Sequence, residues 1–211
     1  AAEAQVQPEL AKRYFEEATK LCERDAGRLW GVSLCGPMVI FDQATGTRAT
    51  SQPEPEGQPP RFPGFADGPV SWGGLRWFSF PLYMLPENDA DVRQQVMLHG
   101  LFHRIQPELA CCAASDGFNE HLDTLEGRVW MQLEWRALRR AVESNGSDRA
   151  EAIADALSFR RERRRQFPGA ADNERRDEIR EGLASYTGIA AWANSPADAR
   201  RAAASALAGG Q

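Results

Sequence analysis

Two histidines, His99 and His103, stand four residues apart in a segment whose apolar spacing predicts a helix. Side chains at positions i and i+4 share one face of a helix, about 5–6 Å apart, so both imidazoles can reach a single metal ion. The chain has three histidines, and the third, His121, follows closely in the sequence. The pair therefore predicts part of a metal site, although two unrelated core or surface histidines would give the same spacing.

A second motif stands on a later predicted helix: the string Glu181-Gly182-Leu183-Ala184-Ser185-Tyr186, preceded by Glu178. Together the two motifs resemble the gluzincin group of zinc metallopeptidases. In that group an H-E-x-x-H helix is completed by a glutamate on a downstream helix, often within an E-G-L-A-x-Y-like string. The resemblance covers about residues 92–190.

The resemblance implies a zincin-like fold, Zn²⁺ as cofactor, and His99, His103 and Glu181 as its ligands. Three protein ligands with one open position describe a catalytic zinc site rather than a structural one. The alternative for Glu181 is a solvated charge within the charged run 173–181.

The sequence departs from the gluzincin motif at Gly100, which stands where the catalytic glutamate should be. That glutamate takes the proton from the zinc-bound water. Because a positioned general base contributes about 10²–10⁴-fold, we expect peptide hydrolysis to be impaired or lost. Glycine also costs about 1 kcal/mol relative to alanine within a helix, so helix stability does not explain it. Gly100 could be an engineered inactivation, mark a natural pseudo-peptidase, or belong to an enzyme whose base comes from elsewhere. If it is a simple loss, Gly100→Glu should create activity.

Two other residues could take part in catalysis. His121 lies in the segment Asn119-Glu120-His121-Leu122-Asp123, where it could stabilise an oxyanion or hold substrate. The alternative is a helix start whose polar residues favour the helix dipole. Tyr186 could point its phenol at a tetrahedral intermediate, as a tyrosine does in related peptidases, or simply pack in the core. A group of aromatic residues could likewise line a substrate cleft or form the core: Trp72, Trp77, Phe78, Phe80 and Tyr83.

These residues must be positioned by secondary-structure elements, with the strands in the first half of the chain and most of the helices after residue 88. Helices are predicted at Pro8 to about Arg28, 88–107 with Asn88 or Asp89 as cap, 119–144, 148–167, 171–192, and after Ser195-Pro196. Strands are predicted at 29–34, 38–41 and 75–82. The proline-rich segment 51–74 is expected to be irregular, either the wall or lid of a site or a surface insertion.

This order predicts an α+β fold with a small antiparallel sheet packed on a mainly helical body. We expect a single domain over residues 1–211. Its first part, about 1–87, would carry a helix, the sheet and the proline-rich loop, and its second part, about 88–211, the metal site.

Net charge and hydrophobic content limit the classes of partner that the chain can bind. The formal net charge is -5 with the two signs interspersed, which argues against nucleic-acid binding. No apolar run approaches the roughly 20 residues of a membrane span. A peptide or protein substrate is the expected partner, and the oligomeric state does not follow from the sequence. Only Lys12 and Lys20 are lysines among 25 basic residues, which suggests a G+C-rich, bacterial genome.

The four cysteines, Cys22, Cys35, Cys111 and Cys112, lack the paired spacing of a structural zinc site and are expected to be free thiols. If the protein is exported, a disulfide could join Cys22 to Cys35, or either of them to one of the later pair. The chain begins without methionine, and a periplasmic or secreted location is favoured.

The expected function is therefore that of a zinc metallopeptidase-like domain, impaired or inactive in this form because Gly100 replaces the general base. The alternative is a non-catalytic pseudo-peptidase that binds a peptide or protein. A plain structural domain with chance histidines is the third interpretation.

Overall fold

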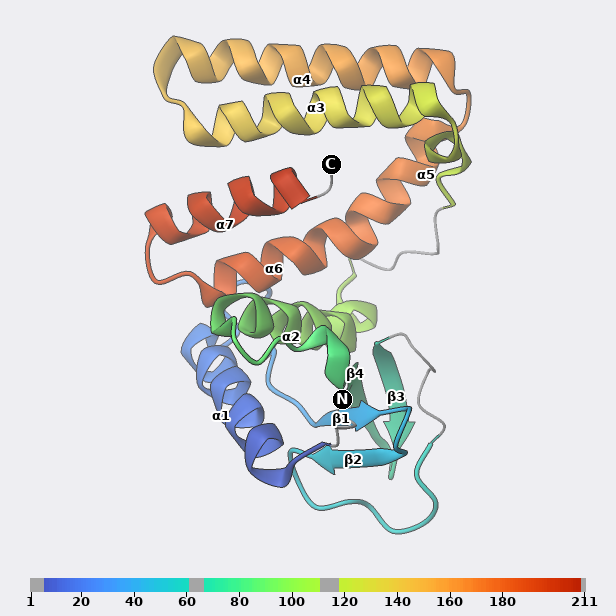
Figure 1. The fold of residues 1–211 in the computed structure, drawn as a ribbon, viewed down its shortest axis with the longest axis vertical. Helices are drawn as coiled ribbons and strands as arrows, with labels where there is room; N and C mark the ends of the chain where they lie inside the picture. Colours follow the sequence, from blue (N-terminus) through green and yellow to red (C-terminus); the bar gives the residue numbers. More distant parts are fainter. Residues whose placement is uncertain (1–5, 61–66, 111–117, 210–211) are drawn as a thin grey trace. The chain divides into compact units, whose positions relative to one another are not determined.

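The computed structural model describes residues 6–60, 67–110 and 118–209 (Figure 1). These residues form an α+β fold with a four-stranded sheet and a mainly helical remainder, as predicted. The chain divides into two compact units. Unit 1 comprises Ala1–Ala113 and Gly182–Trp192, and unit 2 comprises Ala114–Glu181 and Ala193–Gln211. The expectation of a single domain over residues 1–211 stays a prediction.

The described residues of unit 1 form the α-helices α1 (Pro8–Asp25), α2 (Ala90–Ile105) and α6 (Leu183–Trp192). The first begins at Pro8, where the missing N–H costs no helical hydrogen bond. The second begins after Asp89, whose carboxylate accepts a hydrogen bond from the backbone N–H of Val92 at 3.0 Å. The predicted start signals of both helices are confirmed.

The sheet of unit 1 has the strand order β2-β1-β4-β3. Its strands are β1 (Met38–Asp42), β2 (Thr47–Thr50), β3 (Gly68–Trp72) and β4 (Leu75–Pro81). Two hairpins make antiparallel pairs, but β1 and β4 pair in parallel, so the sheet is mixed rather than wholly antiparallel. Parallel pairing needs a long crossover, and the proline-rich excursion that follows β2 supplies its length.

Two strand predictions were wrong. Residues 29–34 form turns and irregular backbone instead of a strand, and Gly27 and Gly31 there adopt positive φ angles of 77° and 72°. Conversely, β3 lies within the segment that was expected to be irregular. Its Pro69 is tolerated because β3 is an edge strand, where a missing N–H leaves no ladder bond unmade. The role of the proline-rich segment as wall or lid stays a prediction, since residues 61–66 lie outside the described ranges.

The core of unit 1 lies between the sheet and α2. Phe78 and Phe80 of β4 are fully buried there, against Gly100 of α2. Because successive strand residues alternate, Trp77 points to the other face of β4, where it is buried in a cluster with Val39 and Trp72. Tyr83, by contrast, is 69% exposed. Most of the aromatic group therefore packs in the core, and α2 lies between β4 and α6 (Figure 1).

Unit 2 is built from helices. Its α-helices are α3 (Leu125–Glu143), α4 (Gly146–Gln166), α5 (Ala170–Asp177) and α7 (Pro196–Gly209). The helix predicted from residue 119 starts later than expected. A short 3₁₀ turn, η3 (Glu120–Asp123), comes first, and Thr124 then caps α3 by accepting from the N–H of Gly127 at 3.0 Å. Ser195 caps α7 as predicted, accepting from the N–H of Asp198 at 3.1 Å.

A disulfide joins Cys22 of α1 to Cys35, so the expectation of free thiols is wrong for this pair. Cys111 and Cys112 lie outside the described residues. In the described part of the chain, no helix combines the length and the apolar character that crossing a membrane requires.

Candidate metal centre

Helix α2 carries the predicted histidine pair. His99 and His103 are both partly buried, with ring centroids 4.7 Å apart and their Nε2 atoms 3.0 Å apart. Two nitrogens bonded tetrahedrally to one zinc ion at 2.0–2.1 Å would be about 3.3 Å apart. The pair therefore needs only a few tenths of an ångström of opening to bind one ion.

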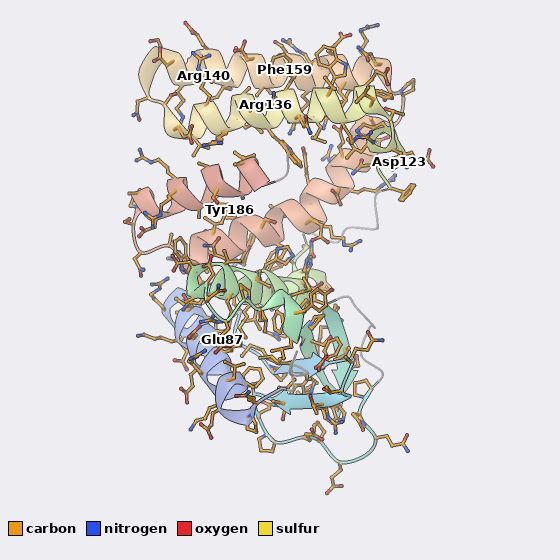
Figure 2. The ribbon with its side chains drawn as sticks, in the orientation of Figure 1. Glu87, Asp123, Arg136, Arg140, Phe159 and Tyr186 are labelled. Atoms are coloured by element: carbon orange, nitrogen blue, oxygen red, sulfur yellow. A yellow bond between two sulfur atoms is a disulfide. The ribbon has the colours of Figure 1, made fainter. Side chains whose placement is uncertain are left out.

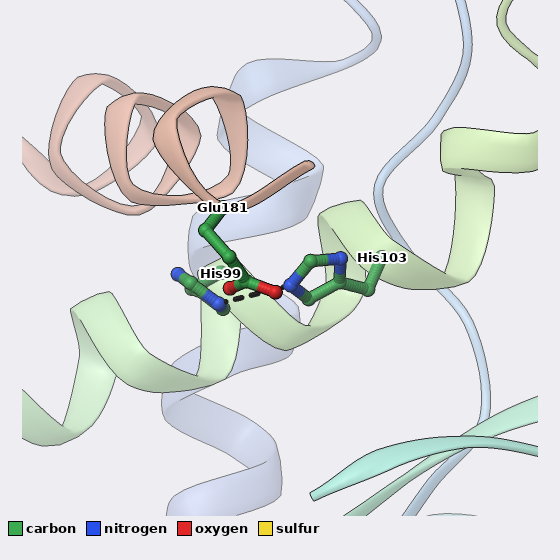
Figure 3. Close-up of side chains that lie close together, drawn as sticks. All are labelled: His99, His103 and Glu181. Carbon is green, nitrogen blue, oxygen red and sulfur yellow. Dashed lines mark hydrogen bonds between the residues drawn. The ribbon is translucent and has the colours of Figure 1, made fainter. Parts of the chain in front are cut away.

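Glu181 completes the cluster. One ligand atom from each of His99, His103 and Glu181 lies within 4.8 Å of the others, and Figure 3 shows the carboxylate beside both rings. Glu181 belongs to a π-helical turn, Glu178–Gly182, which separates α5 from α6 in the predicted helix 171–192. Such turns are rare and occur frequently at functional sites. The structure thus brings together all three residues that the resemblance implies.

Helix α6 approaches α2 closely because Gly188 has no side chain. A Cβ there would lie 2.6 Å from the backbone oxygen of Gln95 and 3.6 Å from the Cβ of His99. The two helices are therefore in backbone contact beside the first histidine. This contact holds α6, which begins two residues after Glu181, beside the histidine helix.

Gln106 supports the second histidine and was missed by the sequence analysis. Its side-chain oxygen lies 2.9 Å from Nδ1 of His103, and the residue is only 7% exposed. Partners of this kind orient metal-binding imidazoles in proteins. A polar residue three positions after His103, directly before Pro107, was the available signal.

The disulfide loop, residues 26–37, reaches both helices. Arg104 of α2 donates hydrogen bonds to the loop carbonyls of Ser33, Leu34 and Cys35, at 3.2, 3.3 and 2.7 Å. Burial lowers the pKa of the Arg104 guanidinium.

On the other side of the loop, the indole N–H of Trp30 donates to Oγ1 of Thr187 in α6 at 3.0 Å. Its ring also packs 5.1 Å from that of Phe102 in α2. The loop therefore ties α2 to α6.

Gly100 lies on the face of α2 turned toward the sheet. A Cβ at this position would be 2.5 Å from Cε1 of Phe80 and 2.6 Å from Cδ1 of Phe78. Real Cβ atoms do not approach other atoms so closely, so a glycine is required for the helix and sheet to pack as they do. Packing against the sheet thus explains the glycine at position 100, which helix propensity does not explain.

The structure places neither of the other two catalytic candidates in the three-residue cluster. His121 is buried in unit 2, where its Nε2 lies 3.0 Å from the carboxylate of Glu174. Tyr186 stands on α6 (Figure 2) with 55% of its surface exposed, and its ring meets Trp30 edge-on at 6.4 Å. A catalytic role for either residue stays a prediction.

Asp177, the last residue of α5, and Glu181 on the following turn repel each other. Burial raises the pKa of Asp177, and the Glu181 carboxylate raises it further, while Arg180 opposes both effects. Arg180 also pairs with Glu181 through its Nε at 2.9 Å. A bound cation would relieve the repulsion between the two carboxylates.

Two imidazole nitrogens and one carboxylate oxygen form a donor set that zinc accepts. The same set suits other divalent transition metals, including iron(II), so the ligands alone do not select the ion. No protein-family model, curated protein or solved structure matches this chain.

Proposed function

We propose that this chain is a zinc-binding, metallopeptidase-like domain whose ligands are His99, His103 and Glu181. The observation that supports this best is the meeting of the three side chains from two motifs far apart in sequence. When bound, zinc would supply Lewis-acid activation of a water molecule at its open position. The chain's own part would be to bring the three ligands together, with Gln106 orienting His103.

Peptide hydrolysis by this domain is expected to be weak. The position of the general base is Gly100, and the rings of Phe78 and Phe80 fill the space that a side chain there would need. Loss of such a base removes about 10²–10⁴-fold in rate. The same packing favours the second candidate, a metal-containing module that binds a peptide or protein without cleaving it.

Zinc content tests the metal site first. The purified chain, reconstituted with zinc and dialysed, should contain about one zinc per chain by elemental mass spectrometry. His103→Ala should lose that metal, because one of three ligands is gone. His121→Gln is the matched control, since it changes the histidine that lies outside the cluster and should leave zinc content intact. A parent chain without zinc would refute the proposal.

Turnover separates the two candidates. The zinc-loaded chain should be incubated with a mixed peptide library and cleavage followed by mass spectrometry, with His103→Ala in parallel. Cleavage that disappears in the variant would establish a peptidase with a base from elsewhere. Full zinc occupancy with no cleavage, together with retention of particular peptides, would establish the binding module.

We further propose that the protein works in an oxidising compartment, periplasmic or extracellular. The disulfide between Cys22 and Cys35 supports this location, because such bonds persist mainly outside the reducing cytosol. Thiol titration of the chain isolated from its native cells would test it.

A further inference from the structure

A pocket in unit 2 lies beside the buried histidine His121, in a part of the chain that the metal centre does not use. Its volume is about 270 Å³, which suits a small ligand. The 3₁₀ turn η3 forms one wall and provides Glu120 and His121. The connection from α4 to α5 forms the other wall with residues 167–170, and Asn173 of α5 continues it.

Local hydrogen bonds fix both walls of this pocket. The carbonyl of His121 accepts from the hydroxyl of Thr124 at 2.7 Å and from the backbone N–H of the same residue at 3.2 Å. In the other wall, Gly169 has a φ of 89°, which residues with a side chain rarely adopt. The N–H of Ala170 donates there to the carbonyl of Phe167 at 3.1 Å. The pocket is therefore formed by the fold before any ligand binds.

The surroundings of His121 determine which ring nitrogen a ligand can use. Its Nε2 lies 3.0 Å from a carboxylate oxygen of Glu174, and both side chains are buried. Burial alone would raise the pKa of Glu174, but hydrogen bonds from Arg163 and Arg164 outweigh burial and lower it, so the carboxylate is ionised. An ionised carboxylate only accepts hydrogen bonds, so a neutral His121 carries its proton on Nε2. The lone pair on Nδ1 is then left for a ligand.

The other side chains of the pocket favour a cation over an anion. Glu120 contributes a carboxylate, and no lysine or arginine is among the described residues that line the pocket. The side-chain oxygen of Asn173 already accepts from Arg176 at 3.0 Å. The ring of Phe167 lies 5.6 Å from that of His121 and gives the pocket an aromatic wall. Organic cations pack favourably against such rings.

We propose that this pocket binds the primary ammonium group of a small organic molecule. The ammonium group donates a hydrogen bond to Nδ1 of His121 and pairs with the carboxylate of Glu120, while the carbon chain packs on Phe167. Three N–H donors and one positive charge allow a single ammonium group to satisfy both acceptors. His121 lies outside the three-residue metal cluster, so this site does not rest on the proposed function.

NMR of the histidine ring hydrogens in the full-length, metal-free chain tests the site at constant pH. The chain has three histidines, and His121→Gln identifies the His121 signals by their loss. Butylammonium chloride should shift these signals to saturation and leave those of His99 and His103 in place. Sodium butyrate, of similar size but opposite charge, should give no saturable shift. Signals of His121 that ignore butylammonium, or that respond equally to butyrate, would overturn the proposal.

Calorimetric titration with butylammonium tests the role of Glu120. Glu120→Gln keeps the shape but removes the charge, so the affinity should fall about two- to fivefold, as expected for the loss of an exposed ion pair. Asp123→Asn is the matched control and should bind as the parent does. Asp123 lies on the same turn but is not among the residues that line the pocket. Equal affinities for the parent and Glu120→Gln would exclude the ion pair.

A second ligand pair tests the hydrogen bond to His121. Butyltrimethylammonium has the charge and the carbon chain of butylammonium but no N–H donor, so it should bind more weakly to the parent chain. Equal binding of the two cations would exclude a hydrogen bond to Nδ1. Because these titrations use metal-free protein, their outcome is independent of whether the chain binds zinc.

Discussion

At the scale of a single residue, catalysis and core packing place opposite requirements on position 100. A gluzincin-type peptidase would need a carboxylate at this position, whereas the packing of α2 on β4 needs the absence of any side chain. In this chain the second demand is met. If the proposed function holds, the absence of a base at this position follows from how the core is packed, and an isolated Gly100→Glu change is not expected to create activity.

Gly100→Ala should destabilise the protein even though alanine favours helices. Overpacking of a filled core typically costs about 1–3 kcal/mol. Alanine gains roughly 1 kcal/mol in helix propensity, so the upper part of the overpacking range outweighs that gain. Urea unfolding followed by circular dichroism would measure the difference. Gly209→Ala is the control, because a Cβ there meets no atom within 4 Å. Unchanged stability of Gly100→Ala would mean that Phe78 and Phe80 can move aside.

Glu181→Gln should weaken zinc binding by at least about tenfold, because it removes the only charged ligand of the proposed set while keeping the side chain's shape. Competition with a coloured chelator would measure the affinity. Glu178→Gln serves as control, since Glu178 lies on the same turn but pairs with Arg160 at 2.8 Å. Equal affinities for the parent and Glu181→Gln would exclude Glu181 as a ligand.

At the scale of elements, the disulfide loop is the part of unit 1 that joins the histidine helix to α6. It reaches α2 through Arg104 and α6 through Trp30. Arg24, near the end of α1, adds hydrogen bonds to the carbonyls of Ala191 and Trp192 at the end of α6. The direct contact at Gly188 and a loop with little regular structure therefore both hold α6 beside α2.

Removing the disulfide by Cys22→Ala with Cys35→Ala should lower the free energy of unfolding by about 3 kcal/mol. This is the typical effect of a disulfide between cysteines 13 residues apart in sequence. Because the loop ties α2 to α6, zinc affinity should fall as well. Thermal unfolding and zinc competition would measure both. A stability loss with unchanged affinity would show that the helices keep their spacing without the loop.

Regular helices were predictable because their signals are local. The proline at the start of α1, the Asp89 cap and the Ser195 cap act within a few residues, and the structure contains each of them. Strand pairing depends on distant residues instead. The parallel pairing of β1 with β4 and the edge position of β3 set the sheet, and neither leaves a mark in local spacing.

The candidate site was predictable to a similar degree. His99, His103 and Glu181 stand out by residue type and motif, but the reason for Gly100 lies in β4, some twenty residues earlier in the chain. Gln106 was missed because its one signal, a polar residue three positions after His103, is too common to single it out. Its role follows only from its distance to His103.

At the scale of the whole molecule, stability should respond to acid through an ion network in unit 2. Glu134 of α3 and Glu174 of α5 both pair with Arg163 of α4, at 2.7 and 2.6 Å, and all three side chains are nearly fully buried. Burial alone would raise the pKa of Glu174, but hydrogen bonds from Arg163 and Arg164 outweigh it and lower the pKa.

The sign of the acid effect follows from that lowered pKa. The network stabilises the fold above the ordinary carboxyl range, near pH 4, and this contribution disappears as pH falls through the pKa of folded Glu174. Glu174→Gln should therefore cost about 3 kcal/mol at pH 7, as when one partner of a buried pair is removed, and much less at pH 3. Urea unfolding at both values would measure it. Glu143→Gln, which breaks an exposed pair with Arg139, should have little effect at either pH.

The packing of Gly100 also constrains how this chain could evolve. A single nucleotide change can turn a glycine codon into a glutamate codon, but the product would place a carboxylate among the rings of Phe78 and Phe80. A path to a base at this position must first shrink those rings, and each such step leaves a cavity in the core. Those intermediates are expected to be less stable than the present chain. Selection for stability alone would therefore tend to keep Gly100, Phe78 and Phe80 together, because changing one of them disturbs the packing of the others.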